Sequence, residues 1–233
     1  PQQKKKAIFT VLSRIVTEYL SSPSANGTKG SPVLRVLEIA AGCGVHTLYF
    51  ATEFTRMGMD VQWHPTDPDP ESRDSIRAWI LQSDPDLDRK DSATDRPRIS
   101  IEQPTSLVLD SSGIVPETVD PQNTSIPKDA SMDLLTCINM IHISPWTATV
   151  GLMKTARAKL RPGGILYLYG PYKVGGIASE SNFNFDTSLQ SRNPSWGVRN
   201  LEDVILQAEQ NGMKHMWTEE MPANNLSVVF QKK

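Results

Sequence analysis

Apolar residues along the chain follow two patterns, one typical of helices and one typical of buried strands. Between residues 7 and 20 they recur every three or four positions, which predicts an amphipathic helix packed against a core. Short continuous apolar runs instead predict strands buried on both sides. The strands expected in this way cover residues 33–39, 61–65, 107–109, 133–139 and 165–169, followed by strand-like pieces at 213–218 and 226–231.

Helices are expected between these strands. They cover residues 46–57 and 73–82, a segment from Ser144 (N-cap) and Pro145 (first helical residue) to about Leu160, and a segment from Asn200 to a stop at Gly212. Alternating helices and strands predict an α/β fold, a mostly parallel sheet with helices on both faces. No repeat or second domain is visible, so residues 1–233 are expected to form one domain, in which 1–32 are an N-terminal helix and loop.

Composition excludes several classes of protein. A hydrophobic content of 38% in 233 residues suits a globular domain with a core, and a net charge of -2 gives no general attraction to nucleic acid. We interpret the run Lys4–Lys6 as a solvated helix start. No apolar run is long enough to span a membrane, and the Cys and His residues lack metal-ligand spacing. We therefore expect a cytoplasmic protein with no metal, no nucleic-acid partner and no membrane contact.

The stretch "LRVLEIAAGCGVH" at residues 34–46 suggests a cofactor site at the end of the first strand. Ligands bind at the carboxyl ends of parallel strands, and residues such as Ala40, Gly42 and Gly44 let the backbone approach them closely. A dinucleotide site favours G-x-G-x-x-G, but Thr47 stands where the third glycine belongs. The carboxylate of Glu38 also disfavours a pyrophosphate. A cationic, phosphate-free nucleoside, S-adenosylmethionine, fits this pattern better; a plain tight turn is the alternative.

Acidic and polar residues after the next strands complete this hypothetical pocket. Asp67 is expected to bind the ribose hydroxyls because it follows the second strand, 23 residues after Gly44, and Asp69 is its competitor. Asp110, after the expected third strand, is placed at the adenine amino group. For Asp67 the alternative is a turn residue that bonds its own backbone, and for Asp110 it is the start of the next loop. After the fourth strand, Asn139 and Met140 are expected to lie against the cofactor or the substrate.

Several segments carry a resemblance to a known family, among them "VLEIAAGCGVH", "CINMIHISPW", "LRPGGILYLYGPY" and "NPSWGVRNLEDV". The chain resembles a methyltransferase-like family long catalogued as a domain of unknown function, with the seven-stranded Rossmann-like fold of class I S-adenosylmethionine-dependent methyltransferases. The resemblance implies strand order 3-2-1-4-5-7-6 with the last strand antiparallel. The chain departs from the pattern at Cys43 and in a polar stretch at 83–98, which we expect to be a mobile surface insertion.

Methyl transfer requires an aligned and desolvated nucleophile, and a hydroxyl nucleophile benefits from a nearby base. Candidate catalytic residues are therefore sought at the carboxyl ends of the strands. His142, His46 and Tyr172 are the candidates, and Tyr169 is a candidate substrate contact. For His142 the alternative is packing at a strand–helix junction, and for His46 it is capping a helix or contacting the methionine carboxylate.

The segment after the fifth strand is too long for an ordinary connection, so we interpret it as a loop that forms a substrate lid. Its candidate substrate contacts, together with two residues of the last hairpin, are Asn182, Phe185, Trp196, Arg199, Asn224 and Asn225. For Phe185 and Trp196 the alternative is that they only seal the edge of the sheet, and for Asn224 and Asn225 it is that they form the hairpin turn. The leading functional hypothesis is an O- or N-directed methyltransferase for a small molecule. A peptide or protein methyltransferase and a cofactor-binding protein without transfer are the others.

Overall fold

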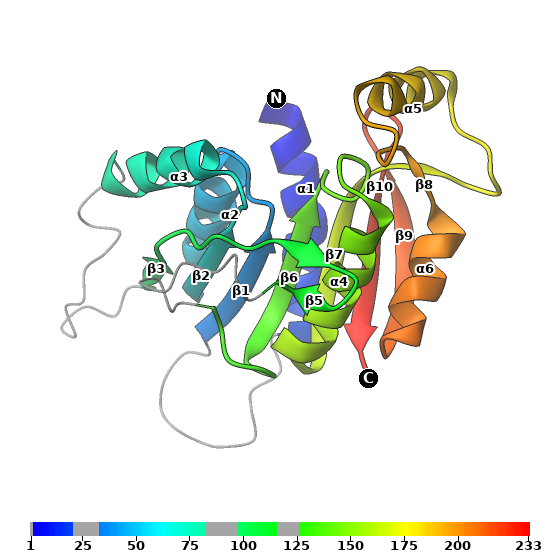
Figure 1. Ribbon diagram of the computed structural model, residues 1–233. Coiled ribbons are helices and arrows are strands. Elements are labelled where there is room, and N and C mark those ends of the chain that lie inside the picture. Colours follow the sequence, from blue (N-terminus) through cyan, green and yellow to red (C-terminus); the bar gives the residue numbers. More distant parts are fainter. Residues whose placement is uncertain (1, 21–32, 83–96, 116–125) are drawn as a thin grey trace.

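A twisted central sheet organises the chain in the computed structural model (Figure 1), which describes residues 2–20, 33–82, 97–115 and 126–233. Its neighbouring strands run in the order β3-β2-β1-β6-β7-β10-β9. Numbered along the chain, these seven strands have the expected order 3-2-1-4-5-7-6. Their bounds are β1 Val33–Ile39, β2 Asp60–Thr66, β3 Ile99–Ile101, β6 Met132–Ile138, β7 Leu160–Lys173, β9 Met213–Met221 and β10 Asn225–Lys232.

Strand directions also agree with the prediction. The pairs from β3 to β7 are parallel, whereas β10 is antiparallel to both β7 and β9. The structure adds an eighth strand, β8 (Arg199–Asn200), which pairs in parallel with the end of β7. The fold is therefore the Rossmann-like α/β arrangement with one short additional strand.

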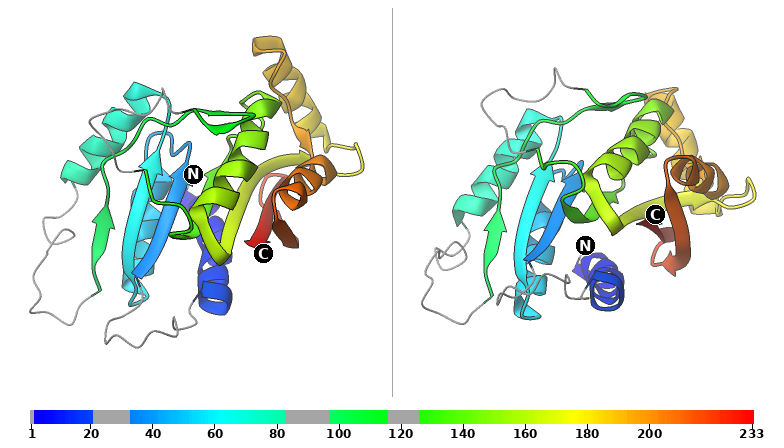
Figure 2. Two further views of the ribbon diagram at one scale, coloured as in Figure 1. Left: turned by 60° about the horizontal axis from the view of Figure 1, so that its bottom comes forward. Right: turned by 90° about the horizontal axis from the view of Figure 1, so that it is seen from below.

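Helices cover both faces of this sheet, and Figure 2 shows α1 and α4 on opposite sides of it. Successive residues of a strand point to opposite faces, so Val36 packs with α1 and α2 while Leu37 packs with α4 and α6. Both side chains are fully buried. The helices are α1 Gln2–Ile15 with a π-helical extension η1 Val16–Leu20, α2 Val45–Arg56, α3 Pro70–Gln82, α4 Trp146–Lys159, α5 Glu180–Arg192 and α6 Leu201–Gln210.

Spacing of apolar residues explains the first helix. Ile8, Val11, Leu12 and Ile15 recur every three or four positions and are at most 2% exposed, so the predicted helical face is confirmed. None of the helices within the described residues is long and apolar enough to cross a membrane.

The prediction of the third strand at residues 107–109 is wrong. This strand lies at β3, where residues 99–101 alternate Ile-Ser-Ile, and the apolar run around Leu107 instead packs into the core beside α4. There the chain forms a small separate hairpin of β4 (Leu109–Asp110) and β5 (Gly113–Ile114). The expected surface insertion falls mostly on residues 83–96, which lie outside the described residues.

Two helix predictions also need correction. Pro145, not Ser144, is the N-cap residue of α4, because the Ser144 hydroxyl donates a hydrogen bond to the Met140 sulfur instead. The lid segment is not a loop throughout, since α5 forms within it, with the Ser179 hydroxyl accepting a hydrogen bond from the Asn182 N–H. For α6, Asn200 is the N-cap residue as expected, and Gly212 follows the helix end at a positive φ of 79°.

Candidate functional site

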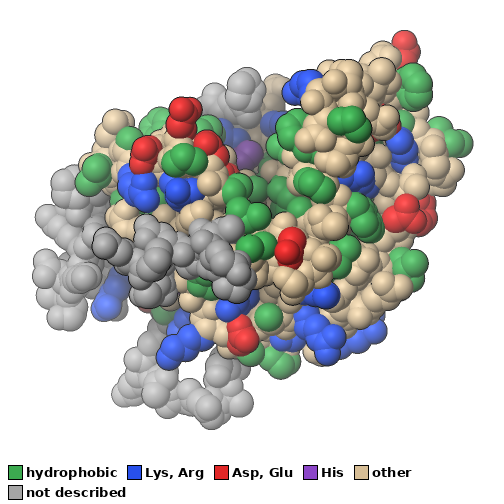
Figure 3. All heavy atoms as spheres, in the orientation of Figure 1, with side chains coloured by type: hydrophobic (Ala, Val, Ile, Leu, Met, Phe, Trp, Pro, Cys, Tyr) green, Lys and Arg blue, Asp and Glu red, His purple; other side chains and the backbone are tan. Residues whose placement is uncertain are grey.

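The candidate site lies at the carboxyl ends of β1, β2, β6 and β7, which meet at one edge of the sheet (Figure 1). The turn after β1 and the loops after β2 and β6 approach one another there. Figure 3 shows this edge as a hollow between the part of the molecule with α3 and the part with α5, and a histidine is visible in it.

The turn from β1 into α2 contains two glycines with different roles. Both have positive φ, 57° at Gly42 and 80° at Gly44. A Cβ at Gly42 would meet no atom within 4 Å, whereas a Cβ at Gly44 would lie 2.8 Å from Cγ1 of Ile76 in α3. Gly44 therefore allows α3 to pack against the turn, and Gly42 leaves open space beside the backbone.

Glu38, near the end of β1, is buried directly before this turn and bonds to the elements on either side of it. One carboxylate oxygen, Oε2, accepts hydrogen bonds from the Thr47 hydroxyl at 2.6 Å and from the Trp63 indole N–H at 2.7 Å. Burial raises the pKa of Glu38 to about 7 against the lowering effect of these two donors. Neither partner was identified from the sequence, although both come from neighbouring elements, α2 and β2.

Asp67 and Asp69 were alternatives for the ribose, and the structure separates them. Asp67 is 6% exposed and accepts hydrogen bonds from the Gly42 N–H at 2.8 Å and the Asp69 N–H at 2.9 Å. Its carboxylate therefore lies directly at the glycine turn. Asp69 instead accepts from the N–H and hydroxyl of Ser72 and caps the start of α3.

Asp110 was expected at this edge of the sheet, but the structure places it elsewhere. It lies in the small hairpin, where its carboxylate accepts hydrogen bonds from the N–H and hydroxyl of Ser112. The same stretch packs closely on α4, since a Cβ at Gly151 would lie 2.1 Å from the Asp110 carbonyl oxygen. Its placement after the third strand is therefore wrong, and the alternative, that Asp110 begins the following turn of the chain, agrees better with the structure.

The loop after β6 brings several predicted residues together. Asn139 has a positive φ of 61° and donates its N–H to the Tyr169 carbonyl at 2.8 Å, so it lies beside the end of β7. Met140 is buried, and its sulfur accepts from Ser144. This loop then leads directly to His142.

His142 is 3% exposed and lies over a glycine of β7. Its ring atoms Nδ1 and Cε1 are each 3.3 Å from the position that a Cβ of Gly170 would occupy, and its ring meets Phe185 of α5 edge-on at 5.5 Å. Nδ1 has no hydrogen-bond partner among the described residues. Burial, with smaller effects of Arg199 and Lys4, lowers the pKa of His142 to about 4, so the imidazole is neutral at pH 7.

Arg199, expected to contact substrate, instead fixes the loop that carries His142. Its guanidinium donates to the carbonyls of Ile141, Ser144 and Ser195 at 3.2, 2.6 and 2.8 Å. Because these carbonyls engage the guanidinium, the role that the structure gives Arg199 is to position the backbone around His142.

The two tyrosines of β7 occupy opposite faces. Tyr172 lies in the core beneath α4 and α6, its hydroxyl has no partner among the described residues, and burial strongly raises its pKa. This placement in the core does not support the catalytic prediction for Tyr172, which stays a prediction. Tyr169 faces α1 and is 1% exposed, and its hydroxyl is likewise unpartnered within the described segments.

Lysines of α1 reach this region, which the sequence reasoning missed. The Lys4 ammonium lies 5.4 Å from the centre of the Tyr169 ring, and Lys5 lies over Tyr49. His46 stacks on Phe50 at 5.3 Å, and burial followed by Lys5 and Lys4 lowers its pKa to about 4. The run Lys4–Lys6 lies at the start of a helix as interpreted, but Lys4 and Lys5 are only partly exposed and contact aromatic rings.

The remaining predicted substrate residues mostly fasten α5 to its neighbours. Asn182 donates to the Asn224 carbonyl at 2.8 Å, and the Asn224 side chain donates to the Ser181 hydroxyl. Asn225 donates to two carbonyls of its own turn, the alternative role considered for it. Trp196 is half-buried, and its backbone N–H donates to the Asn193 carbonyl and so closes a turn. Of this group, Phe185 contacts His142 directly.

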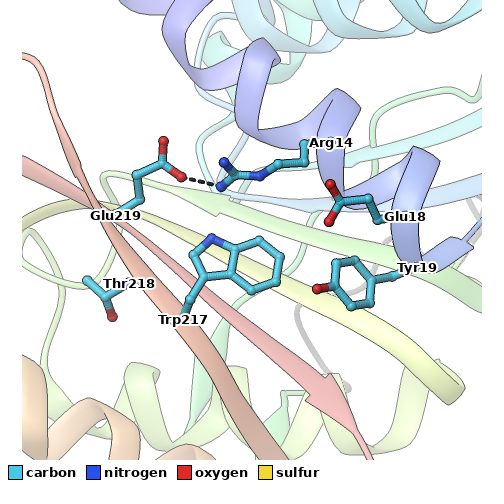
Figure 4. Close-up of a pocket in the computed structure, with 6 residues that line it drawn as sticks. All are labelled: Arg14, Glu18, Tyr19, Trp217, Thr218 and Glu219. Atoms are coloured by element: carbon cyan, nitrogen blue, oxygen red, sulfur yellow. Dashed lines mark hydrogen bonds and ion pairs between the residues drawn. The ribbon is translucent and has the colours of Figure 1, made fainter.

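A cavity of about 380 Å³ lies elsewhere, between the end of the first helix and β9 (Figure 4). Arg14 lies over the Trp217 ring there and pairs with Glu219, while Tyr19 packs on the same indole at 5.4 Å. None of the predicted cofactor residues lines it, so we do not assign the cofactor to it. Within the described residues, no group of three or more His, Cys, Asp or Glu side chains could hold a metal ion.

Solved structures with the same fold are numerous, at low sequence identity. The C-methyltransferase domain of the citrinin polyketide synthase matches with a TM-score of 0.64 at 17% identity over 98% of this chain and 52% of that chain. LepI in complex with S-adenosylmethionine matches with a TM-score of 0.59 at 14% identity, over 94% of this chain and 46% of that chain. Human N-acetylserotonin methyltransferase in complex with the same molecule matches with a TM-score of 0.56 at 11% identity, over 98% of this chain and 54% of that chain.

These matches show the fold of class I methyltransferases, and this chain spans about half the length of the solved chains. A family model described as "Protein of unknown function (DUF938)" matches residues 2–232, nearly the whole sequence. The chain therefore belongs to this DUF938 family.

Proposed function

We propose that this protein is an S-adenosylmethionine-dependent methyltransferase that acts on an oxygen or nitrogen of a small molecule. One observation carries the proposal: a buried carboxylate, Asp67, is bonded to the backbone of a turn at Gly42 beside open space. This pairing suits a nucleoside, whose ribose hydroxyls need an acceptor and whose body needs a backbone without side chains.

The same region argues against a dinucleotide. Thr47 occupies the place of the third glycine, it is 2% exposed, and its hydroxyl is committed to Glu38. A buried carboxylate so close to the turn would repel a pyrophosphate. The residues present therefore fit a phosphate-free nucleoside, held by Asp67 at the sugar and by Gly42, Asn139 and Met140 along its length.

When bound, the cofactor supplies a methyl group on a positively charged sulfur that leaves readily. The protein then has to hold an acceptor in line, exclude water and take up a proton. We assign the proton to His142, because its imidazole is neutral, its Nδ1 has no partner among the described residues, and its ring lies over Gly170 against Phe185. Arg199 keeps its backbone in place.

Calorimetric titration with S-adenosylmethionine and S-adenosylhomocysteine tests the shared premise, and Asp67→Ala provides the matched variant that should lose binding. Incubation of a metabolite extract with isotopically labelled cofactor then tests transfer by mass spectrometry. Label in a small molecule supports the proposal, and label in peptides supports the alternative protein substrate. Binding without any labelled product would instead favour a protein that uses the cofactor site without transfer.

A further inference from the structure

The amino-terminal turn of α1 places a positive charge against the end of β7. The Lys4 ammonium lies 5.4 Å from the centre of the Tyr169 ring. It also lowers the pKa of both His46 and His142, so it lies within electrostatic range of the first turn of α2 and of the loop after β6. One cation therefore acts on three elements that border the candidate site.

This cation is not neutralised by the described part of the protein. No carboxylate there forms an ion pair with Lys4, whereas Lys173 pairs with Asp186 at 2.6 Å. The aromatic and imidazole groups near it are neutral. At pH 7 both histidines are uncharged, and burial raises the pKa of Tyr169 to about 12, so its phenol keeps its proton.

The two acids of the site form no ion pair with Lys4 in the described structure, since their carboxylates are engaged elsewhere. Asp67 already accepts two backbone N–H groups, and Oε2 of Glu38 accepts from Thr47 and Trp63. With a pKa of about 7, Glu38 is also only partly ionised at neutral pH. The Lys4 ammonium beside β7 is therefore available to a negatively charged ligand group.

A buried donor without a partner lies at the same place. Tyr169 is 1% exposed, and its hydroxyl forms no hydrogen bond to the described residues. A buried hydroxyl without an acceptor costs free energy, which a ligand oxygen can recover. Charge and donor thus point to the same kind of ligand.

We propose that Lys4 and Tyr169 form a subsite for an anionic oxygen group, a carboxylate or an ionised acidic hydroxyl, of a ligand in the site. The inference rests on the proposed function and deepens it. Two ligands could carry such a group, namely the cofactor through its methionine carboxylate and the methyl acceptor through its own acidic oxygen.

The test compares Lys4→Gln with Lys4→Arg, which keeps the charge, and with Lys6→Gln, a matched control at an exposed position of the same helix. Each protein is titrated with S-adenosylhomocysteine and with 5′-methylthioadenosine, which lacks the carboxylate. The same proteins, saturated with S-adenosylhomocysteine, are then titrated with benzoate and with the neutral analogue benzamide.

If Lys4 serves the cofactor, Lys4→Gln weakens S-adenosylhomocysteine binding about ten-fold and leaves methylthioadenosine binding unchanged. If it serves the acceptor, the same variant loses about ten-fold in benzoate affinity and none in benzamide affinity. Lys4→Arg and Lys6→Gln should resemble the wild type in both cases. Unchanged affinities in Lys4→Gln would overturn the subsite alone, whereas a wild-type protein that binds neither nucleoside would overturn the proposed function, and the subsite with it.

Discussion

Replacing the two glycines of the turn one at a time separates packing from ligand contact. Both have left-handed φ angles, so an alanine at either position costs about 1–2 kcal/mol of unfolding free energy. At Gly44 the new methyl would also lie 2.8 Å from Cγ1 and 3.3 Å from Cα of Ile76, well inside the 3.5–4.0 Å of an ordinary carbon contact. Overpacking of this kind adds about 1–3 kcal/mol.

Gly42→Ala should therefore lower the unfolding free energy by about 1–2 kcal/mol and Gly44→Ala by about 2–5 kcal/mol. Among folded molecules, Gly42→Ala should weaken cofactor binding more than Gly44→Ala does. The Gly42 methyl would project into the open space where we place the nucleoside, so Gly42→Ala should weaken S-adenosylhomocysteine binding at least ten-fold.

Urea unfolding and calorimetric titration measure the two effects. Gly58→Ala is the control, because Gly58 has a φ of 88°, no atom within 4 Å of its added Cβ, and a position at the other end of α2. It should match Gly42→Ala in stability and the wild type in affinity. Wild-type affinity in Gly42→Ala would refute the assignment of this turn to the nucleoside.

The remaining predictions concern charged residues of the site. The pKa of Glu38 is raised from 4.5 to about 7 in the folded protein, so the wild type should lose unfolding free energy relative to Glu38→Gln as pH rises from 5 to 7. The lowered pKa values of His46 and His142 stabilise both proteins as pH rises toward 6.5, so the difference between the two unfolding curves is the quantity measured, and a constant difference would contradict the buried carboxylate's role. Asp67→Ala should abolish cofactor binding in calorimetry, whereas Asp69→Ala should keep it and lose about 1 kcal/mol as a helix cap; equal losses of binding would contradict this separation. Arg199→Ala should cost about 2 kcal/mol and lower turnover in the labelled-cofactor assay with cofactor affinity unchanged, and undiminished turnover would remove its positioning role.

Features set by local sequence were predictable. Residues 33–39 form β1 as expected, because a run of branched apolar side chains bounded by a glycine turn has few other structures. The parallel direction of the inner strands and the position of Asp67 at the turn follow from the same alternation of strands and helices, whereas the strand order was implied by the family resemblance.

Features set by tertiary contacts were not. The inner face of α5 is held by Asn182, Asp186 and Leu189, so it has no apolar stripe from which a helix can be recognised. β3 has only three residues, and a longer apolar run nearby was the stronger signal. The contact between Lys4 and Tyr169 joins residues 165 positions apart, and no local pattern announces it.

The chain leaves the sheet at Lys173 and returns at Arg199, and these two ends lie side by side because β7 and β8 pair in parallel, Tyr172 with Arg199 and Lys173 with Asn200. An excursion that starts and finishes at one place can change in length at little entropic cost, about 0.6 kcal/mol for a doubling. A change of length within residues 174–198 is therefore expected to leave the pairing of β7 with β8 intact.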